Sequence, residues 1–294
     1  FGNWFQTHKY DLIIVLGDRH EILGACTAAL IHQIPIVHIH GGDISEGAID
    51  DCIRHSITKM SNFHFPATQL SAKRIYQMGE CSEDIFTVGS LGVENASNHV
   101  QHSDQFTMIE KPFALLTCHS ETRRKLEEIP KQQREILEAL KLYEGKVLVT
   151  QSNCDLGGDK INQIHGTWEA TYPSKFFRLD NLGWKYHTVL KHADFCIGNS
   201  SSALIEAPAL KTPSIDIGNR QKGRERGASV IHCDWSRNSI NNAIKKCLNT
   251  NWINEDHRFN SPYQIGDFTP SELIARNILN ILKKPTSNKK FYLY

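Results

Sequence analysis

Short apolar runs alternate with amphipathic stretches along most of this chain of 294 residues. A strand-like run at 11–17 is followed by a helix-like stretch at 21–33 and by a second strand-like run at 35–40. Strands that alternate with helices in this way are typical of βαβ units, in which helices cover a parallel sheet. The sequence therefore predicts an α/β protein.

The alternation continues in two series. The first adds predicted helices at 48–60 and 70–79 and predicted strands at 63–67 and 85–90. The second series consists of predicted strands at 113–118, 147–151, 176–179, 195–198, 214–217 and 230–233 and helices at 131–143, 160–171, 186–191, 202–210 and 239–249. Between them lies 94–105, a polar stretch without apolar periodicity that is typical of a linker.

Two series predict two doubly wound, Rossmann-like domains, at 1–105 and 106–294. Sheets of this kind bind ligands at the carboxyl ends of their strands, so we expect a ligand site in a cleft shared by the two domains. A last amphipathic stretch at 270–283 is expected to pack across the domains as a terminal helix.

Charge and cysteine spacing exclude several classes of function. With 33 Lys and Arg against 32 Asp and Glu, the net charge of +1 offers no field for nucleic acid or an anionic membrane. The eight cysteines lie singly, without a C-x-x-C pair or zinc-like spacing, which indicates reduced thiols. No apolar run reaches the length of a membrane span, and the start lacks a signal sequence. We expect a cytoplasmic protein without a metal site.

The segment IGNSSS at 197–202 ends a predicted strand and opens a helix. Small hydroxyl residues and free backbone amides at a helix N-terminus form an anion site, so Ser200 and Ser201 are candidate phosphate ligands. The alternative is that a serine only caps the helix. Glu206, one turn into the helix, could accept two ribose hydroxyls or could be a surface residue.

The segment IGNRQKGR at 217–224 combines two glycines with three cations after the next predicted strand. An arginine offers forked donors and a lysine a point charge, a combination that suits a diphosphate. A solvated basic loop is the alternative. Because this loop follows a strand at the same sheet edge as the serines, we favour phosphate binding, with Arg220 as the main ligand.

Two strand ends of the first domain carry further candidates. Asp18 and Arg19 follow the first strand, where Asp18 would project into the cleft or cap the helix that begins near Glu21. The second strand ends in HIHGGD, and alternation places His38 and His40 on one face. This pair could bind a metal, but a buried hydrogen-bonded pair is commoner, so no metal is predicted.

The predicted helix at 48–60 begins after a glycine-rich turn with two adjacent carboxylates, Asp50 and Asp51. Helical spacing lets Asp50 reach Arg54 and lets Asp51 reach both Arg54 and His55. These charges could form an exposed ion-paired face, but carboxylates just after such a turn favour a position in the cleft. In the second domain His119 follows a predicted strand and could act as general acid or as phosphate ligand.

Taken in order, these segments resemble one known family. LGDRHE, HIHGGDISEGAIDDCIRHSITKM, the strand that ends at His119, GNSSSALIEAP and IGNRQKGR are similar to motifs of the UDP-N-acetylglucosamine 2-epimerase family, and most similar to its hydrolysing members. The resemblance covers about residues 10 to 250. It implies two Rossmann-like domains of the GT-B type, with UDP held mainly by the C-terminal domain, and a homodimer. The family has further strands before the first residue here, so a truncated N-terminal domain is expected.

The resemblance also assigns roles to the candidate residues. Those that match substrate-binding positions, or are expected to bind substrate, are Arg19, Arg54, Ser200, Ser201, Glu206 and Arg220. Those expected to take part in catalysis are Asp18, His40, Asp50, Asp51 and His119. His40 stands where many non-hydrolysing members have a glutamate.

The implied reaction eliminates UDP across C1 and C2 of the sugar and then adds water to the glycal, which gives N-acetylmannosamine for sialic-acid-type synthesis. Departure of UDP precedes proton loss because no carbonyl acidifies C2; Asp18, Asp51 or His40 would be the base. No cofactor is required. A non-hydrolysing epimerase, an epimerase for another UDP- or GDP-linked amino sugar, a GT-B glycosyltransferase and an inactive fragment are the alternatives.

Overall fold

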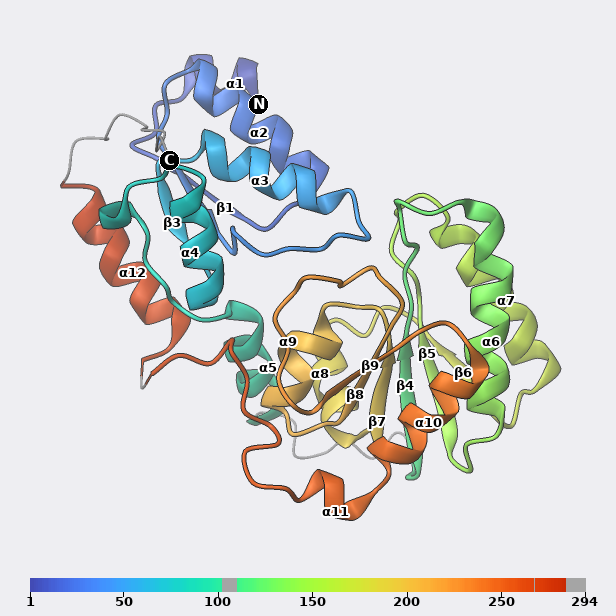
Figure 1. Ribbon diagram of the computed structural model, residues 1–294. Helices are drawn as coiled ribbons and strands as arrows, with labels where there is room; N and C mark the ends of the chain where they lie inside the picture. The colour runs from blue at the N-terminus through green and yellow to red at the C-terminus, as the bar shows by residue number, and fades with distance from the viewer. Residues whose placement is uncertain (102–109, 267, 284–294) are drawn as a thin grey trace. The chain divides into compact units, whose positions relative to one another are not determined.

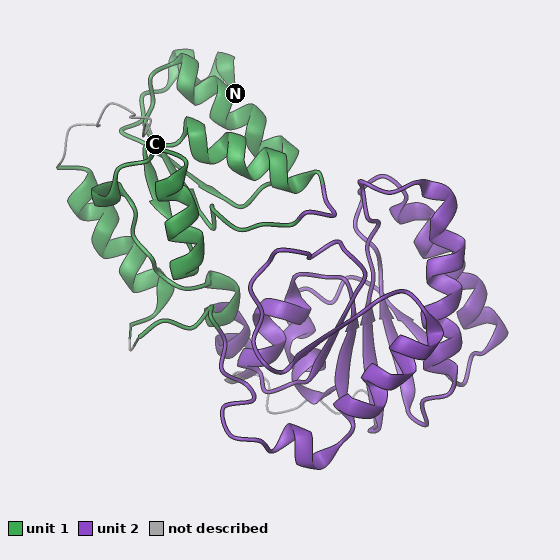
Figure 2. Cartoon of the chain, viewed as in Figure 1, with its two compact units in different colours: residues 1–45, 49–94, 262–294 green, residues 46–48, 95–261 purple. Residues whose placement is uncertain are grey.

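The computed structural model describes residues 1–101, 110–266 and 268–283, which form two compact units (Figure 2). Unit 1 consists of residues 1–45 and 49–94 together with the described residues from 262 onwards. Unit 2 consists of residues 46–48 and the described residues between 95 and 261. Both units are α/β with parallel sheets, as predicted.

Unit 1 is built on a parallel sheet of order β1-β2-β3 (Figure 1). Its strands are β1 (Ile13–Leu16), β2 (Ile36–Ile39) and β3 (Phe63–Phe65), and its helices are α1 (Gly2–Thr7), α2 (His20–Ile31), α3 (Asp50–Met60), α4 (Gln69–Gln77), the 3-10 turn η1 (Ser82–Asp84) and α12 (Pro270–Ile281). Helix α5 (Leu91–Gln101) begins in unit 1 and continues into unit 2.

Side chains of β2 alternate between two apolar layers. Ile36 packs with Ile57 of α3 and with residues of α2, whereas the next residue, Val37, packs with Ile274 of α12. The alternation follows from the period of two in a strand. Because β2 is covered on both faces, it is apolar at nearly every position.

Unit 2 contains a larger parallel sheet of order β6-β5-β4-β7-β8-β9. Its strands are β4 (Phe113–Thr117), β5 (Lys146–Thr150), β6 (Phe176–Leu179), β7 (Phe195–Gly198), β8 (Ser214–Ile217) and β9 (Val230–Cys233). Its helices are α6 (Ile129–Lys141), α7 (Gly158–Thr171), α8 (Lys185–His192), α9 (Ser202–Ala209), α10 (Arg237–Cys247) and α11 (Thr250–Ile253), with the 3-10 turn η2 (Leu126–Glu128).

Helices α6, α7 and α10 cover one face of this sheet, and α8 and α9 cover the other (Figure 1). The strand order reverses next to β4, since β5 lies on one side of β4 and β7 on the other. A doubly wound sheet binds ligands at such a point, outside the carboxyl ends of its strands. The topology therefore predicts a ligand site at the segments that follow β4, β5 and β7.

Two predictions for the end of unit 1 were wrong. The predicted strand 85–90 forms only a single bridge, between Ile85 and His64, although Phe86 donates to the His64 carbonyl at 2.9 Å. The return bond of that ladder needs an amide hydrogen at Pro66, which has none. The predicted linker is helical as far as Gln101, within α5, and its remainder, 102–105, lies outside the described residues.

The domain limits also differ from those expected at 1–105 and 106–294. Residues 262–283 belong to unit 1 because Ile274 and Ile281 of α12 pack against Val37 and Phe63. Helix α12 therefore completes the core of unit 1. None of the helices in the described part of the chain is long and apolar enough to cross a membrane.

Candidate functional site

In unit 1 the polar side chains gather around the buried guanidinium of Arg54, which is 1% exposed. Nε and Nη2 both donate to Oδ2 of Asp18, with a distance of 2.9 Å from Nε. Nη2 also donates to Oγ of Ser45 at 3.0 Å, while Nη1 donates to the carbonyl of Asp43 at 2.8 Å and to Oδ1 of Asp51 at 3.5 Å. The five N–H groups of a guanidinium are thus matched by five protein contacts. In this structure Arg54 holds other site residues in place, and its role as a substrate ligand stays a prediction.

Asp18 lies next to the N-terminus of α2 without capping it. The capping position is occupied by Arg19, which makes no side-chain cap. The described contacts of Asp18 all use Oδ2, and those of Asp51 all use Oδ1, which also accepts the backbone N–H of Ser45 at 2.7 Å. Among the described residues, each carboxylate therefore keeps one oxygen outside these contacts, which could accept a proton.

The two histidines of HIHGGD do not share a face. His38 is buried, and its imidazole contacts the Gly17 carbonyl at 2.9 Å and Thr58 of α3 at 3.1 Å. Burial lowers the pKa of His38 to about 3, so it is neutral at pH 7. His40 lies beyond the end of β2 with a φ of 67°, and this left-handed backbone ends the alternation of the strand.

The imidazole of His40 is engaged at both nitrogens. Nδ1 lies 3.5 Å from a carboxylate oxygen of Asp43, and Nε2 lies 3.3 Å from Oγ of Ser90. The ring also stacks on Tyr263 at 6.3 Å between centroids. Nε2 contacts Ser90 in this structure, and the role of His40 as a base stays a prediction.

Two other predicted residues of unit 1 lie at helix starts. Arg19 is about two-fifths exposed and pairs with Glu21 at 3.3 Å. Asp50 is the first residue of α3 and is half-buried, and the adjacent Asp51 lies 3.8 Å from His55. The roles of Arg19 and Asp50 stay predictions.

In unit 2, His119 follows β4 and is fixed by neighbours on two other strand ends. Its Nδ1 accepts the backbone N–H of Asn153 at 3.1 Å. Asn199 accepts the backbone N–H of His119 at 2.7 Å and donates to its carbonyl at 2.9 Å. Burial, followed by the positive charge of Arg220, lowers the pKa of His119 to about 3. His119 is therefore neutral at pH 7, with its proton on Nε2, and is a hydrogen-bond donor there.

The basic loop after β8 is tied to the segment that follows β7. Arg220 is 8% exposed, and its Nη1 donates to the carbonyl of Asn199 at 3.4 Å. Gln221 donates to the same carbonyl at 3.0 Å. The Arg220 guanidinium also lies 3.7 Å from a carboxylate oxygen of Asp155. The guanidinium is thus held beside the His119 loop, and the alternative of a solvated basic loop does not apply to Arg220.

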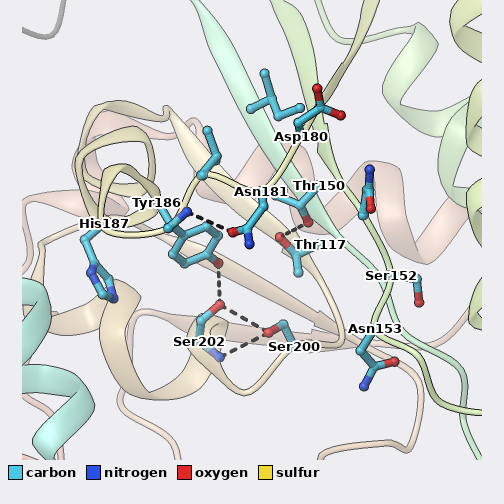
Figure 3. A pocket seen from close by; sticks show the side chains of 14 residues that line it. Thr117, Thr150, Ser152, Asn153, Asp180, Asn181, Tyr186, His187, Ser200 and Ser202 are labelled. Atoms are coloured by element: carbon cyan, nitrogen blue, oxygen red, sulfur yellow. Dashed lines mark hydrogen bonds between the residues drawn. The ribbon is translucent and has the colours of Figure 1, made fainter.

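A cavity of about 550 Å³ opens at the carboxyl ends of β4, β5, β6 and β7 (Figure 3). The Tyr186 hydroxyl lies 2.5 Å from Oγ of Ser202, which in turn lies 3.3 Å from Oγ of Ser200. Thr150 donates to Thr117 across the two strand ends at 2.9 Å. The cavity is lined by Thr117, Thr150, Gln151, Ser152, Asn153, Leu179, Asp180, Asn181, Leu182, Gly183, Tyr186, His187, Ser200 and Ser202. Its volume is in the range of small-molecule sites.

The predicted serines have different positions. Ser201 is the residue before α9 and makes no side-chain cap, whereas Ser200 lines the cavity and its Oγ accepts the backbone N–H of Ser202, the first residue of α9, at 3.4 Å. Glu206 lies one turn into α9 and is half-buried. Whether these residues bind a nucleotide stays a prediction.

Sequence reasoning missed most of the cavity lining. The segment that follows β5 contributes Ser152, which is 8% exposed and whose hydroxyl has no hydrogen-bond partner among the described residues. The polar run after Thr150 was the available signal, since it ends a strand next to β4. Tyr186 had no such signal, because its hydroxyl is directed by a contact with α9 that spacing does not reveal.

No group of three or more metal-binding side chains occurs within residues 1–101, 110–266 and 268–283. Of the predicted residues, Asp18 and Asp51 each contact Arg54. His119 and Arg220 form a second group, which is joined by contacts to Asn199.

Comparison with known proteins identifies one family. The family model described as UDP-N-acetylglucosamine 2-epimerase matches residues 1–279. The polysialic acid biosynthesis protein P7 of Escherichia coli is 36% identical over 99% of this chain and 76% of its own length. A GDP/UDP-N,N'-diacetylbacillosamine 2-epimerase (hydrolyzing) of Campylobacter jejuni is 35% identical over 99% of this chain and 77% of its own length.

A solved structure of S. aureus MnaA with UDP is also similar, with a TM-score of 0.79 and 18% identity. The match covers 99% of this chain and 80% of that one. This likeness concerns the fold, and it confirms the expected GT-B class with two Rossmann-like units.

Proposed function

Because the chain belongs to the UDP-N-acetylglucosamine 2-epimerase family, we propose that it is a hydrolysing member, which converts UDP-N-acetylglucosamine to UDP and N-acetylmannosamine. The observation that carries the choice is the 35% identity, over 99% of the chain, to a relative named as a hydrolyzing 2-epimerase. The similarity to a polysialic acid biosynthesis protein supports a role in sialic-acid-type synthesis.

In this proposal unit 2 holds the nucleotide. The nucleoside occupies the cavity beside Tyr186, and the diphosphate meets Ser200, the Nε2–H of His119 and the guanidinium of Arg220. A neutral imidazole suits this task because it donates a hydrogen bond to an anion without first gaining a proton. Glu206 would accept hydroxyl groups of the ribose.

The first step breaks the C1–O bond, and the bonding electrons leave with the UDP oxygen. Cationic and N–H groups around the diphosphate stabilise the negative charge that develops there, in the manner of an oxyanion site. Positive charge builds up at C1 at the same time and acidifies the proton on C2. Loss of that proton to a base yields the glycal.

Asp18 or Asp51 is the proposed base, because each has an oxygen that Arg54 does not use. Arg54 fixes the direction of both carboxylates, a positioning effect that is worth several kcal/mol in catalysis. Water then adds to the glycal, with its proton at C2 and its hydroxyl at C1. The products are N-acetylmannosamine and free UDP, with no oxidant or reductant consumed.

A second candidate substrate is a UDP- or GDP-linked diacetamido sugar. It is supported by the name of the C. jejuni relative, which includes both nucleotides and diacetylbacillosamine. The chemistry at C1 and C2 is the same for this sugar. The candidates differ in the sugar substituents away from C1 and C2, at C4 among them, and in the base where the nucleotide is GDP.

The test is proton NMR of the purified chain with UDP-N-acetylglucosamine in deuterated water. We expect N-acetylmannosamine with deuterium at C2, together with free UDP. UDP-N-acetylmannosamine as product would instead indicate a non-hydrolysing epimerase. Release of UDP only when an acceptor is added would indicate a glycosyltransferase.

A parallel reaction with UDP- or GDP-linked diacetamidosugar decides between the substrates by their kcat/KM values. A chain that turns over none of these sugars, yet melts cooperatively and is stabilised by UDP, would retain nucleotide binding without the proposed reaction. A chain whose melt UDP does not shift would contradict the proposal altogether.

A further inference from the structure

Glu121 is a buried carboxylate that joins two loops of unit 2. It lies two residues after His119 and is 3% exposed. Its Oε1 accepts the backbone N–H of Asn219 at 2.7 Å and the indole N–H of Trp235 at 3.2 Å. Its Oε2 pairs with Nε of Arg124 at 2.6 Å. One side chain of the His119 loop therefore supplies the acceptor for the backbone next to Arg220.

The start of the basic loop is shaped around this carboxylate. Gly218 has a φ of 76°, a conformation that favours glycine. A Cβ at Gly218 would lie 2.3 Å from Oε1 of Glu121 and 2.2 Å from Nε1 of Trp235, closer than real Cβ contacts. The backbone can approach the carboxylate only because this residue has no side chain. The close approach brings the next residue, Asn219, into hydrogen-bonding distance.

We propose that Glu121 is a positioning residue, which fixes the basic loop so that Arg220 faces the diphosphate of the substrate. The inference rests on the proposed function, since it assumes a diphosphate at Arg220. Glu121 touches no substrate in this scheme. It acts through the backbone of Asn219. Because His119 lies on the same loop as Glu121, Glu121 also fixes the positions of His119 and Arg220, the two proposed diphosphate ligands, relative to each other.

The side chain at this position is needed for its reach and for its acceptor oxygen, Oε1. An amide at the same place keeps an acceptor for Asn219 and Trp235 but loses the ion pair with Arg124. Removal of the side chain leaves the N–H groups of Asn219 and Trp235 without their acceptor. The contacts of Arg220 and Gln221 with Asn199 and the ion pair of Lys222 with Glu46 then remain.

The test uses Glu121→Ala and Glu121→Gln, with Glu128→Ala as matched control. Glu128 pairs with the same Arg124 at 2.9 Å but lies at the surface and makes no described contact with the basic loop. Two quantities are measured on the full chain: hydrogen exchange of the peptide that spans 218–226 without ligand, and the dissociation constant of UDP by calorimetry.

We expect Glu121→Ala to speed exchange in this peptide and to raise the dissociation constant of UDP about tenfold. We expect Glu121→Gln and Glu128→Ala to stay within about threefold of the parent chain. Glu121→Asp keeps the charge but shortens the side chain by one methylene. It serves as a second variant and should change both quantities in the same direction as Glu121→Ala.

Unchanged exchange in Glu121→Ala or Glu121→Asp overturns the inference, whatever UDP does. Faster exchange with an unchanged UDP affinity overturns it too, because the loop would then move without consequence for the ligand. If the parent chain binds no UDP but Glu121→Ala still speeds exchange, the proposed function fails while the hold of Glu121 on the loop is supported.

Discussion

Arg54 donates to a single oxygen of Asp18, Oδ2, through both Nε and Nη2. Arg54 lies on α3, the helix that follows β2, and Asp18 lies just after the end of β1. The contact joins residues 36 positions apart. It fixes the position of Oδ2 and leaves the other oxygen outside the pair. Because Arg54 also contacts Asp51, one guanidinium orients both candidates for the base.

Arg54→Lys should lower the free energy of unfolding by about 2–4 kcal/mol, because a lysine ammonium cannot replace five donors in a fixed fork and leaves buried acceptors unpaired. Urea denaturation measures the change. Arg178→Lys is the control, since Arg178 pairs with Glu169 at 2.8 Å near the surface and should change stability by less than about 0.5 kcal/mol. Equal losses in both variants would contradict the special role of Arg54.

At least one of Asp18→Asn and Asp51→Asn should reduce kcat by about a hundredfold or more, because an amide at the position of the base does not accept the C2 proton. The dissociation constant of UDP should change little, since UDP is proposed to bind to unit 2. Turnover by NMR and UDP binding by calorimetry check the two parts. Asp11→Asn, at an exposed position of unit 1, is the control. Full turnover in both site variants would remove the aspartates from the mechanism.

Most strands were predicted well from the sequence because residues that disfavour strands flank them. In unit 2 the predicted limits of four strands agree with β6, β7, β8 and β9, which are short apolar runs bounded by polar residues, proline or glycine. Helix α5 was missed because only Val93 and Ala96 of its residues are buried in the described part, so its sequence reads as polar. Residues 262–283 were placed in the wrong unit because periodicity gives no packing partner.

The candidate site was predictable only where chain order determines position. Asp18, His119 and Arg220 follow strands, so a parallel sheet brings each to a carboxyl edge. The fork between Arg54 and Asp18 depends on a tertiary contact that helical spacing does not contain. The hold of Glu121 on Asn219 spans 98 positions and was missed for the same reason.

Tyr186→Phe and Tyr186→Ala should separate the two functions of this side chain. The Tyr186 side chain is half-buried at the cavity, and loss of solvation raises the pKa of its hydroxyl, which stays neutral beside Ser202. Loss of the hydroxyl alone should cost about 1 kcal/mol of stability and change UDP affinity less than about threefold. Loss of the ring should cost about 3–5 kcal/mol and weaken UDP more than about tenfold. Urea denaturation and calorimetry measure both, and similar UDP affinities for the two variants would place the nucleoside elsewhere.

Buried histidines should make the protein sensitive to mild acid. Burial lowers the pKa values of His38 and His119 to about 3 and that of His165 to about 4, against an ordinary value of 6.5. Below pH 6.5 the unfolded chain binds these protons and the folded chain does not, so the free energy of unfolding falls as the pH falls. The slope approaches about 1.4 kcal/mol per pH unit for each histidine.

Urea denaturation at several pH values between 7.5 and 5 measures this slope. His165→Gln should make this slope shallower, because the variant has no imidazole to protonate at position 165. In the parent chain Nε2 of His165 contacts Gln133 at 2.8 Å, and neither residue belongs to the proposed site. His20→Gln, at an exposed position, serves as control and should keep the slope of the parent chain. If His165→Gln also keeps that slope, the histidine is protonated equally in the folded and unfolded states and the explanation by burial is wrong.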